Sequence, residues 1–232
     1  MNNTDFLSHP LSRQEKLWGG AWLVFETLLL SVVLRYLNRL LPTPLPQVTI
    51  NFLFFCVNFA VVAIFLRKYL LAQLGLAKDS LGKILLTAFV GFVAYWMLNF
   101  LISSLILSLD PNFSSVNDKA VAELVADNFS IMFFGTVILV PVAEESLFRG
   151  VIFRGMYERS PALAWIVSVA LFALVHILGY MGSASPARLL LCFVQYIPAG
   201  ICLAAAYRLS GSILSPILIH AAVNFVGMMA LR

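Results

Sequence analysis

Charged side chains are scarce in this sequence of 232 residues: Asp, Glu, Lys and Arg make up 11% of it, and hydrophobic residues make up 61%. Soluble globular chains carry roughly 25% charged and about 45–50% apolar residues. Because so few charges cannot cover the surface of a water-soluble protein, an ordinary soluble domain is excluded. Glycine and proline, at 13 and 10 residues, are too few for a collagen-like or disordered chain. The composition therefore predicts a protein that crosses a membrane several times.

Cysteine is also scarce, with three residues in the whole chain. Cys56, Cys192 and Cys202 lie within apolar runs and lack a metal-ligand spacing such as Cys-x-x-Cys, so we interpret them as small buried residues. A disulfide-rich secreted scaffold is excluded for the same reason. The formal net charge of +4 indicates basic loops that face anionic lipid. We expect the lipid bilayer, and no nucleic acid, as the partner of these charges.

A membrane-crossing helix needs about 20 mainly apolar residues, and seven windows of the sequence meet this requirement. They run from Leu17 to Leu34, Ile50 to Leu66, Ile84 to Leu109, Ser130 to Ile152, Ala162 to Tyr180, Arg188 to Tyr207 and Ser212 to Leu231. The linkers are short, so residues 1–232 are expected to form a single transmembrane domain. The predicted fold class is all-α: a polytopic transmembrane helical bundle of about seven to eight spans.

Two connecting segments have patterns of their own. Residues 114–128 combine acidic residues with apolar residues at helical spacing, which predicts a short interfacial helix on the membrane surface. Three prolines at positions 42, 44 and 46 predict a turn between the first two spans.

The distribution of Lys and Arg predicts the orientation, because cytoplasmic loops are enriched in both residues. With the N-terminus inside, ten basic residues lie on the cytoplasmic side: Arg13, Lys16, Arg67, Lys68, Lys78, Lys83, Arg149, Arg154, Arg159 and Arg208. The other five are Arg35, Arg39, Lys119, Arg188 and Arg232. The prediction is a multi-pass protein of the cell membrane with a cytoplasmic N-terminus. The polar residues 1–16 indicate no cleaved signal peptide.

The few polar groups inside the predicted spans each need a partner or a function, because an ionisable side chain at a helix centre costs about 2.5–3.5 kcal/mol. The main candidates, on three spans, are Glu144, Glu145, Arg149, His176, His220 and Asn224. Glu26, Asn58 and Asn99 lie in the first three spans and are assigned no role.

Helical geometry separates the two adjacent glutamates. Glu145 and Arg149 are four residues apart in the order that favours an ion pair, which we interpret as structural. Glu144 lies about 100° round the helix, so its side chain can point elsewhere. A carboxylate in an apolar pocket can act as a general base, and His and Asn groups can bind water or an oxyanion. Since a lone His or Asn is as readily a packing residue, the hypothesis of amide hydrolysis depends on the whole set. Pro141 is expected to kink the helix beside Glu144.

The arrangement of these residues resembles a known family. Three motifs follow in order within hydrophobic spans: Glu144-Glu145-x-x-x-Arg149, Phe172-x-x-x-His176 and His220-x-x-x-Asn224. They look like the motifs of the CPBP family, the CAAX prenyl endopeptidases and bacteriocin-processing (Abi) enzymes that are intramembrane proteases. The resemblance extends from Ser130 to Phe225, and the motif-bearing catalytic core is placed at residues 130–228.

The resemblance implies a role for each motif residue. Glu144 would activate the attacking water and His176 would share it. His220 and Asn224 would form the oxyanion site. Glu145 and Arg149 would be supporting residues, and Phe172 would line the cavity.

The expected function is an intramembrane endopeptidase that cleaves a membrane-associated, CAAX-like or bacteriocin-type peptide, without a cofactor, in a cavity open to the cytoplasmic side. One alternative is a zinc protease with Glu144, His176 and His220 as ligands, although a His-Glu-x-x-His signature is missing. Others are a non-proteolytic scaffold or bacteriocin-immunity protein of the same fold, or a small transporter. The partner is a peptide or protein substrate in the membrane; the sequence leaves the oligomeric state open.

The predicted spans place Glu144 and His176 at different depths in the membrane. If the fourth span ends near Ile152, Glu144 lies near the cytoplasmic end of its helix, whereas His176 lies roughly 21 Å into the next helix at 1.5 Å per residue. Groups that share a water molecule must lie at one depth, so tilt or a different helix boundary has to close this gap.

Overall fold

The structure is a computed structural model that describes residues 11–232, and all its named elements are helices. Residues 1–10 lie outside the described part of the chain, so most of the segment on which the signal-peptide prediction is based is not described. The elements are α2 (Arg13–Phe25), η1 (Glu26–Leu30), α3 (Ser31–Arg39), α4 (Gln47–Phe65), α5 (Arg67–Leu109), α6 (Val116–Asp127), α7 (Phe129–Phe134), η2 (Gly135–Leu139), α8 (Val140–Glu145), η3 (Ser146–Arg154), α9 (Gly155–Tyr157), α10 (Pro161–Leu178), α11 (Pro186–Ser210) and α12 (Leu214–Ala230).

Six continuous helices are long and apolar enough to cross a membrane, and α12 is a shorter apolar helix. The six are Arg13–Arg39, Gln47–Phe65, Arg67–Leu109, Phe129–Tyr157, Pro161–Leu178 and Pro186–Ser210. Together with α12 they correspond to the seven predicted windows. The protein is thus a multi-pass helical membrane protein, as predicted. Helix α6 occupies the position of the predicted interfacial helix.

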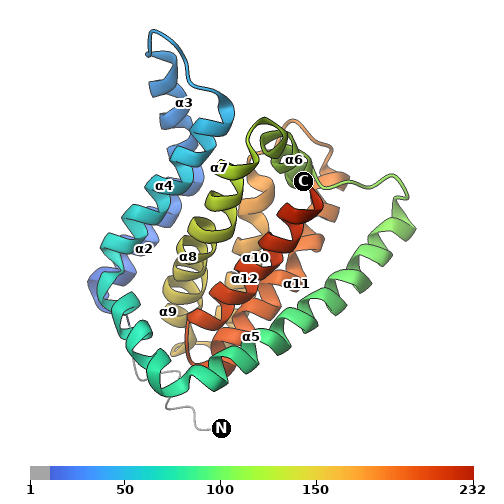
Figure 1. Cartoon of the computed structure of the whole chain (residues 1–232). Coiled ribbons are helices and arrows are strands. Elements are labelled where there is room, and N and C mark those ends of the chain that lie inside the picture. The colour runs from blue at the N-terminus through green and yellow to red at the C-terminus, as the bar shows by residue number, and fades with distance from the viewer. Residues whose placement is uncertain (1–10) are drawn as a thin grey trace.

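The bundle has two ends that differ in the elements they carry (Figure 1). At one end lie the α3–α4 turn, α6 and the end of α12; we call it the α6 end. At the other lie the start of α2, the N-terminal half of α5, the turn between α9 and α10 and the turn between α11 and α12. We call it the basic end, because these segments hold eight of the 15 Lys and Arg residues: Arg13, Lys16, Arg67, Lys68, Lys78, Lys83, Arg159 and Arg208.

Helix α5 is much longer than the predicted span from Ile84 to Leu109. Its 43 residues rise about 65 Å, whereas the hydrocarbon core is about 30 Å thick. The extra N-terminal half packs across the basic end through two buried residues. The Tyr69 backbone N–H donates to Glu15 Oε1 at 2.9 Å, and Gln73 Oε1 accepts from the Ile213 N–H at 2.9 Å. These long-range bonds stabilise the N-terminal half of α5 as a helix, whereas hydropathy alone predicts a loop for this segment.

The fourth membrane helix continues past the predicted end at Ile152 to Tyr157. Glu144 therefore lies about 20 Å from the turn that leads into α10, and His176 lies about 22 Å beyond that turn. The two residues are at nearly the same depth. The apparent gap came from placing the helix end too early.

Pro141 affects this helix differently from the expected simple kink. The segment before it, η2, is π-helical, and the Val140 N–H donates to Gly135 O, five residues earlier. Proline has no N–H, so the next bond in the series is missing. The Thr136 carbonyl consequently loses both of its ordinary partners within the helix. Such π-helical bulges are frequent at functional sites.

A dense apolar core fills the bundle between its middle and the basic end. Its fully buried members include Leu66, Leu147, Phe148, Phe153, Tyr207 and Ile213. Tyr69 and Tyr207 share a hydrogen bond of 2.8 Å within it. None of the six residues just named lines the cavity that is described below.

Candidate active site

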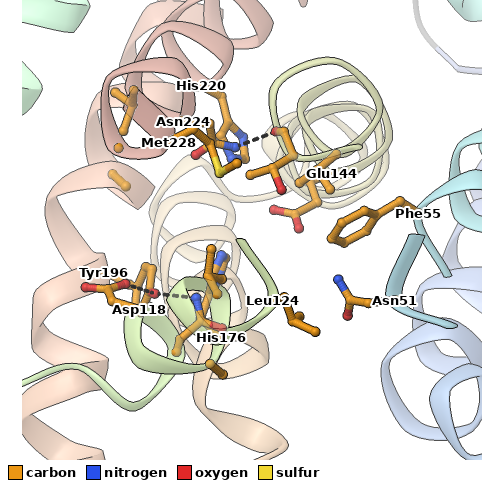
Figure 2. A pocket seen from close by; sticks show the side chains of 18 of the residues that line it. Asn51, Phe55, Asp118, Leu124, Glu144, His176, Tyr196, His220, Asn224 and Met228 are labelled. Carbon is orange, nitrogen blue, oxygen red and sulfur yellow. Dashed lines mark hydrogen bonds between the residues drawn. The ribbon is translucent and has the colours of Figure 1, made fainter. Parts of the chain in front are cut away.

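A cavity of about 850 Å³ occupies the middle of the bundle and extends to the α6 end. Its wall is formed by residues from α3, α4, α5, α6, η2, α8, α10, α11 and α12. Five of the seven predicted site residues line it: Glu144, Phe172, His176, His220 and Asn224. Residues remote in sequence thus meet in one space, as Figure 2 shows.

Glu144 points into this cavity from α8 (Figure 2). Its Oε2 atom is buried and has no hydrogen-bond partner among the residues that the structure describes. Buried polar atoms are nearly always hydrogen-bonded, so an unpartnered carboxylate oxygen facing a cavity is a site for water or for a substrate N–H. Glu144 also lies close enough to His176 for their charges to interact.

His176 is held in a defined orientation near the end of α10. Its Nδ1 lies 2.7 Å from the Phe172 carbonyl oxygen, one turn earlier. A carbonyl only accepts, so Nδ1 carries the proton and Nε2 is left as an acceptor in neutral imidazole. The ring stacks on Tyr196, with centroids 4.2 Å apart and planes inclined by 26°. This arrangement leaves one basic nitrogen for chemistry.

Tyr196 connects His176 to the amphipathic helix α6. The Tyr196 hydroxyl accepts from Asn117 Nδ2 at 2.9 Å and donates to Asp118 Oδ1 at 3.4 Å. No sequence pattern points to Tyr196, because it lies 20 residues from His176 on another helix and belongs to none of the three motifs. Its position indicates that α6 helps to fix the histidine ring.

Glu145 and Arg149 form the expected ion pair, and it includes His220. Arg149 Nη1 donates to Glu145 Oε1 at 3.1 Å, and His220 Nδ1 lies 2.8 Å from the same oxygen. Glu145 and Arg149 are both fully buried. The network joins α8 and η3 to α12, so it fixes His220 at the cavity wall while Glu145 itself stays outside the lining.

Arg149 makes two further contacts across the bundle. Its Nη2 donates to the Gly200 carbonyl oxygen of α11 at 3.2 Å, and its guanidinium lies 4.3 Å from the centre of the Phe172 ring. A Cβ atom at Gly200 would lie 2.9 Å from Val169 Cγ1 and 3.2 Å from its Cα, so α10 and α11 pack closely here. Backbone acceptors of this kind leave no side-chain pattern in a sequence.

Asn224 is positioned by the backbone carbonyl that lacks a helical partner because of Pro141. Its Nδ2 donates to the Thr136 carbonyl oxygen at 2.8 Å, the carbonyl that the π-helical segment leaves without a backbone partner. A carboxamide carries two N–H hydrogens, and this bond uses one of them. Pro141 and Asn224, 83 residues apart in sequence, therefore act together.

The structure does not bring the zinc-ligand candidates into a metal site. Among residues 11–232, no group of three or more His, Cys, Asp or Glu side chains is placed to hold a metal ion. His220 Nδ1 is engaged by Glu145, and His176 Nδ1 by a backbone carbonyl. The set of Glu144, His176 and His220 therefore lacks a preformed ligand geometry.

Comparison with known proteins defines the class to which this site belongs. Residues 126–226 match the model of a family described as type II CAAX prenyl endopeptidase Rce1-like. This region is an Rce1-like domain, and it includes every predicted site residue, so the resemblance seen from Ser130 to Phe225 is confirmed. Neither the curated proteins nor the solved structures gave a match.

The stack of Tyr196 on His176 can be tested without an activity assay. In Tyr196→Ala, the His176 ring protons lose ring-current shielding, and we expect their NMR signals to move downfield in detergent-solubilised protein. In Tyr196→Phe the stack remains, so the signals stay close to their original positions. Equal shifts in both variants would show that the hydroxyl bonds to α6, and not the stack, hold the ring.

The buried ion pair predicts a large effect on stability. Arg149→Met leaves Glu145 buried with only His220 as a partner, and breaking a buried pair costs about 3–5 kcal/mol. We expect the free energy of unfolding, measured in detergent, to fall by about this amount. The double variant Glu145→Leu/Arg149→Met should recover most of the loss, and exposed Lys78→Met is the control. Wild-type stability of Arg149→Met would contradict the assignment.

Proposed function

We propose that this protein is an intramembrane endopeptidase that cleaves a membrane-associated peptide with water activated by Glu144 and His176. The observation that carries the proposal is the unpartnered, buried oxygen of Glu144 in the cavity, close to a histidine whose Nε2 is free to accept. The Rce1-like domain match supports the same reaction class.

In the proposed reaction, Glu144 and His176 act on the water molecule, and Asn224 and His220 act on the substrate oxygen. Glu144 accepts a proton from a water molecule that His176 Nε2 also binds, and the water oxygen attacks the substrate carbonyl carbon. As the carbon becomes tetrahedral, its oxygen gains negative charge, which the second N–H of the Asn224 carboxamide stabilises. His220 adds an N–H from Nε2 in its doubly protonated form, since its Nδ1–H is bonded to Glu145. The C–N bond then breaks, and the proton held by Glu144 passes to the departing nitrogen as the amine leaves.

The neighbouring carboxylate supports this division. Glu145 and Glu144 adjoin in sequence, but Glu145 is neutralised by Arg149 and bonded to His220. The two carboxylates differ in which oxygens are free: Glu145 Oε1 is bonded to both Arg149 and His220, whereas Glu144 Oε2 faces the cavity without a partner. Of the two, Glu144 is therefore the one placed to accept a proton from water.

We also propose that the protein lies in the cell membrane with its N-terminus on the cytoplasmic side. Eight of the 15 basic residues lie at the basic end, among them Lys16 at the start of α2, and five lie at the α6 end; the other two, Arg149 and Arg154, are buried in the bundle. Excess Lys and Arg in short loops is the main determinant of orientation.

The proposed base is tested by Glu144→Gln, which preserves size and removes the basic oxygen. General acid–base catalysis contributes about 10²- to 10⁴-fold, so we expect a loss of cleavage in that range while the unfolding transition stays unchanged. Exposed Asp79, on α5, provides the control Asp79→Asn, which makes the same change from carboxylate to carboxamide away from the cavity. Comparing the membrane peptidomes of cells with wild-type protein and with Glu144→Gln identifies substrates. Full activity of purified Glu144→Gln would disprove the proposal.

The proposed mechanism uses no metal, and this can be tested with the purified protein. We expect cleavage to persist after exhaustive dialysis against a chelator, and elemental analysis to find no stoichiometric zinc. If activity disappears with the chelator and returns with added zinc, the zinc-dependent alternative is correct.

A further inference from the structure

The N-terminal half of α5 extends the helix beyond the part that is needed to cross the membrane. Residues 84–109 rise about 39 Å, which crosses a hydrocarbon core of about 30 Å at the tilts usual for membrane helices. Residues 67–83 rise a further ~26 Å and lie below the other helices in Figure 1. We call this segment the α5 arm. It lies at the basic end, outside the span.

One face of the α5 arm is fixed to the bundle. Its residues Tyr69 and Gln73, four positions apart, are both buried. The Tyr69 backbone is bonded to Glu15 and its hydroxyl to Tyr207, while Gln73 accepts from the Ile213 N–H. These bonds set the rotation of the helix about its axis. They therefore determine which side chains of the arm point away from the protein.

An apolar stripe runs along one exposed side of the arm. Leu71, Leu74 and Leu81 have 66%, 54% and 55% of their surface exposed. At about 100° per residue, the three leucines lie within about 80° of one another around the helix. A single exposed leucine is ordinary, but three along one side of a helix at the end of a membrane bundle indicate contact with lipid.

Basic residues occupy the other exposed side. Lys68 and Lys83 are exposed and lie about 130° round the helix from the leucine stripe, while Arg67 and Lys78 lie among the leucines. Asp79 is the one acidic residue of the arm, so four basic residues less one acidic residue give a formal charge of +3. Within residues 11–232, none of the four cations forms an ion pair. Their charges are available to an external anion.

Exposed leucines beside unpaired cations are typical of a helix that lies in the interface between lipid and water. The leucines enter the apolar boundary of the bilayer, and the long Lys and Arg side chains extend to the phosphate groups. A zwitterionic headgroup balances its phosphate with its own cation, whereas an anionic headgroup keeps a net negative charge that attracts Lys and Arg. The charge of the arm therefore favours anionic phospholipid.

We infer that residues 67–83 form an interfacial anchor that binds anionic phospholipid headgroups in the leaflet at the basic end. This site is separate from the cavity, because no residue of the arm lines it. The inference depends neither on the proposed protease function nor on the compartment that the basic end faces. Since the buried face of the same arm bonds to α2, α11 and the turn before α12, bound lipid also supports the packing of this end.

Fluorescence quenching tests the depth and the lipid preference of the arm. Cys56, Cys192 and Cys202 are replaced by alanine, and a bimane fluorophore is attached to Leu74→Cys in phosphatidylcholine nanodiscs. Increasing fractions of phosphatidylglycerol or phosphatidylcholine with brominated acyl chains are then included. We expect both lipids to quench the fluorophore, and phosphatidylglycerol to do so at a severalfold lower fraction. Exposed Met97→Cys, in the middle of the same helix, is the reference for lipid contact without a headgroup preference.

The basic side of the arm is tested by variants that remove or keep its charge. In the labelled Leu74→Cys protein, Lys68→Gln and Lys83→Gln should each lower the preference for phosphatidylglycerol about fivefold, the effect of one cation near the membrane surface. The matched controls Lys68→Arg and Lys83→Arg keep the charge and should retain the preference.

Three outcomes would overturn the inference. If neither lipid quenches residue 74, the arm lies in water. If both lipids quench it equally, the arm lies in the interface without an anionic-lipid site. If the Gln and Arg variants lose the preference to the same extent, charge is not its cause. None of these measurements needs enzymatic activity, so an error in the proposed function leaves them unaffected.

Discussion

The buried network of Glu145, Arg149 and His220 is the interaction on which the site depends. Two charged side chains with no exposed surface are costly in a bundle of this kind, and their mutual ion pair offsets part of that cost. Glu145 Oε2 and Arg149 Nε have no hydrogen-bond partner among the described residues. The same network joins α8, η3 and α12 and reaches the Gly200 carbonyl of α11. By occupying Glu145, it leaves Glu144 as the carboxylate that faces the cavity.

A second constraint comes from Pro141. A missing N–H is usually a defect in a membrane helix, because the bilayer offers no water to replace the lost bond. Here the π-helical segment leaves the Thr136 carbonyl without a backbone N–H donor, and Asn224 Nδ2 donates to this carbonyl instead. The side chain proposed to stabilise an oxyanion is therefore oriented by backbone geometry on a neighbouring helix. The hydrogen bond from Asn224 to Thr136 thus both orients the Asn224 side chain and joins α12 to η2.

The sequence predicted the elements whose signals are local and missed those that depend on tertiary contacts. Seven apolar windows and three motifs can be read from composition and spacing. The helical half of α5 before Ile84 could not, because it is polar and held by long-range bonds of Tyr69 and Gln73. Tyr196 was missed for the same reason: its importance comes from stacking on His176 and bonding to α6, and neither contact has a spacing in the sequence.

The scarcity of charge has two separate consequences in this protein. Charges that stay within the bundle need partners, so Glu145 pairs with Arg149, and Glu144, beside them, faces the cavity. The other charges lie mainly at the two ends, and more Lys and Arg lie at the basic end than at the α6 end. Because the cavity extends to the α6 end and the excess of Lys and Arg lies at the opposite end, the two features are linked by the fold: the orientation of the bundle in the membrane decides which compartment the cavity faces.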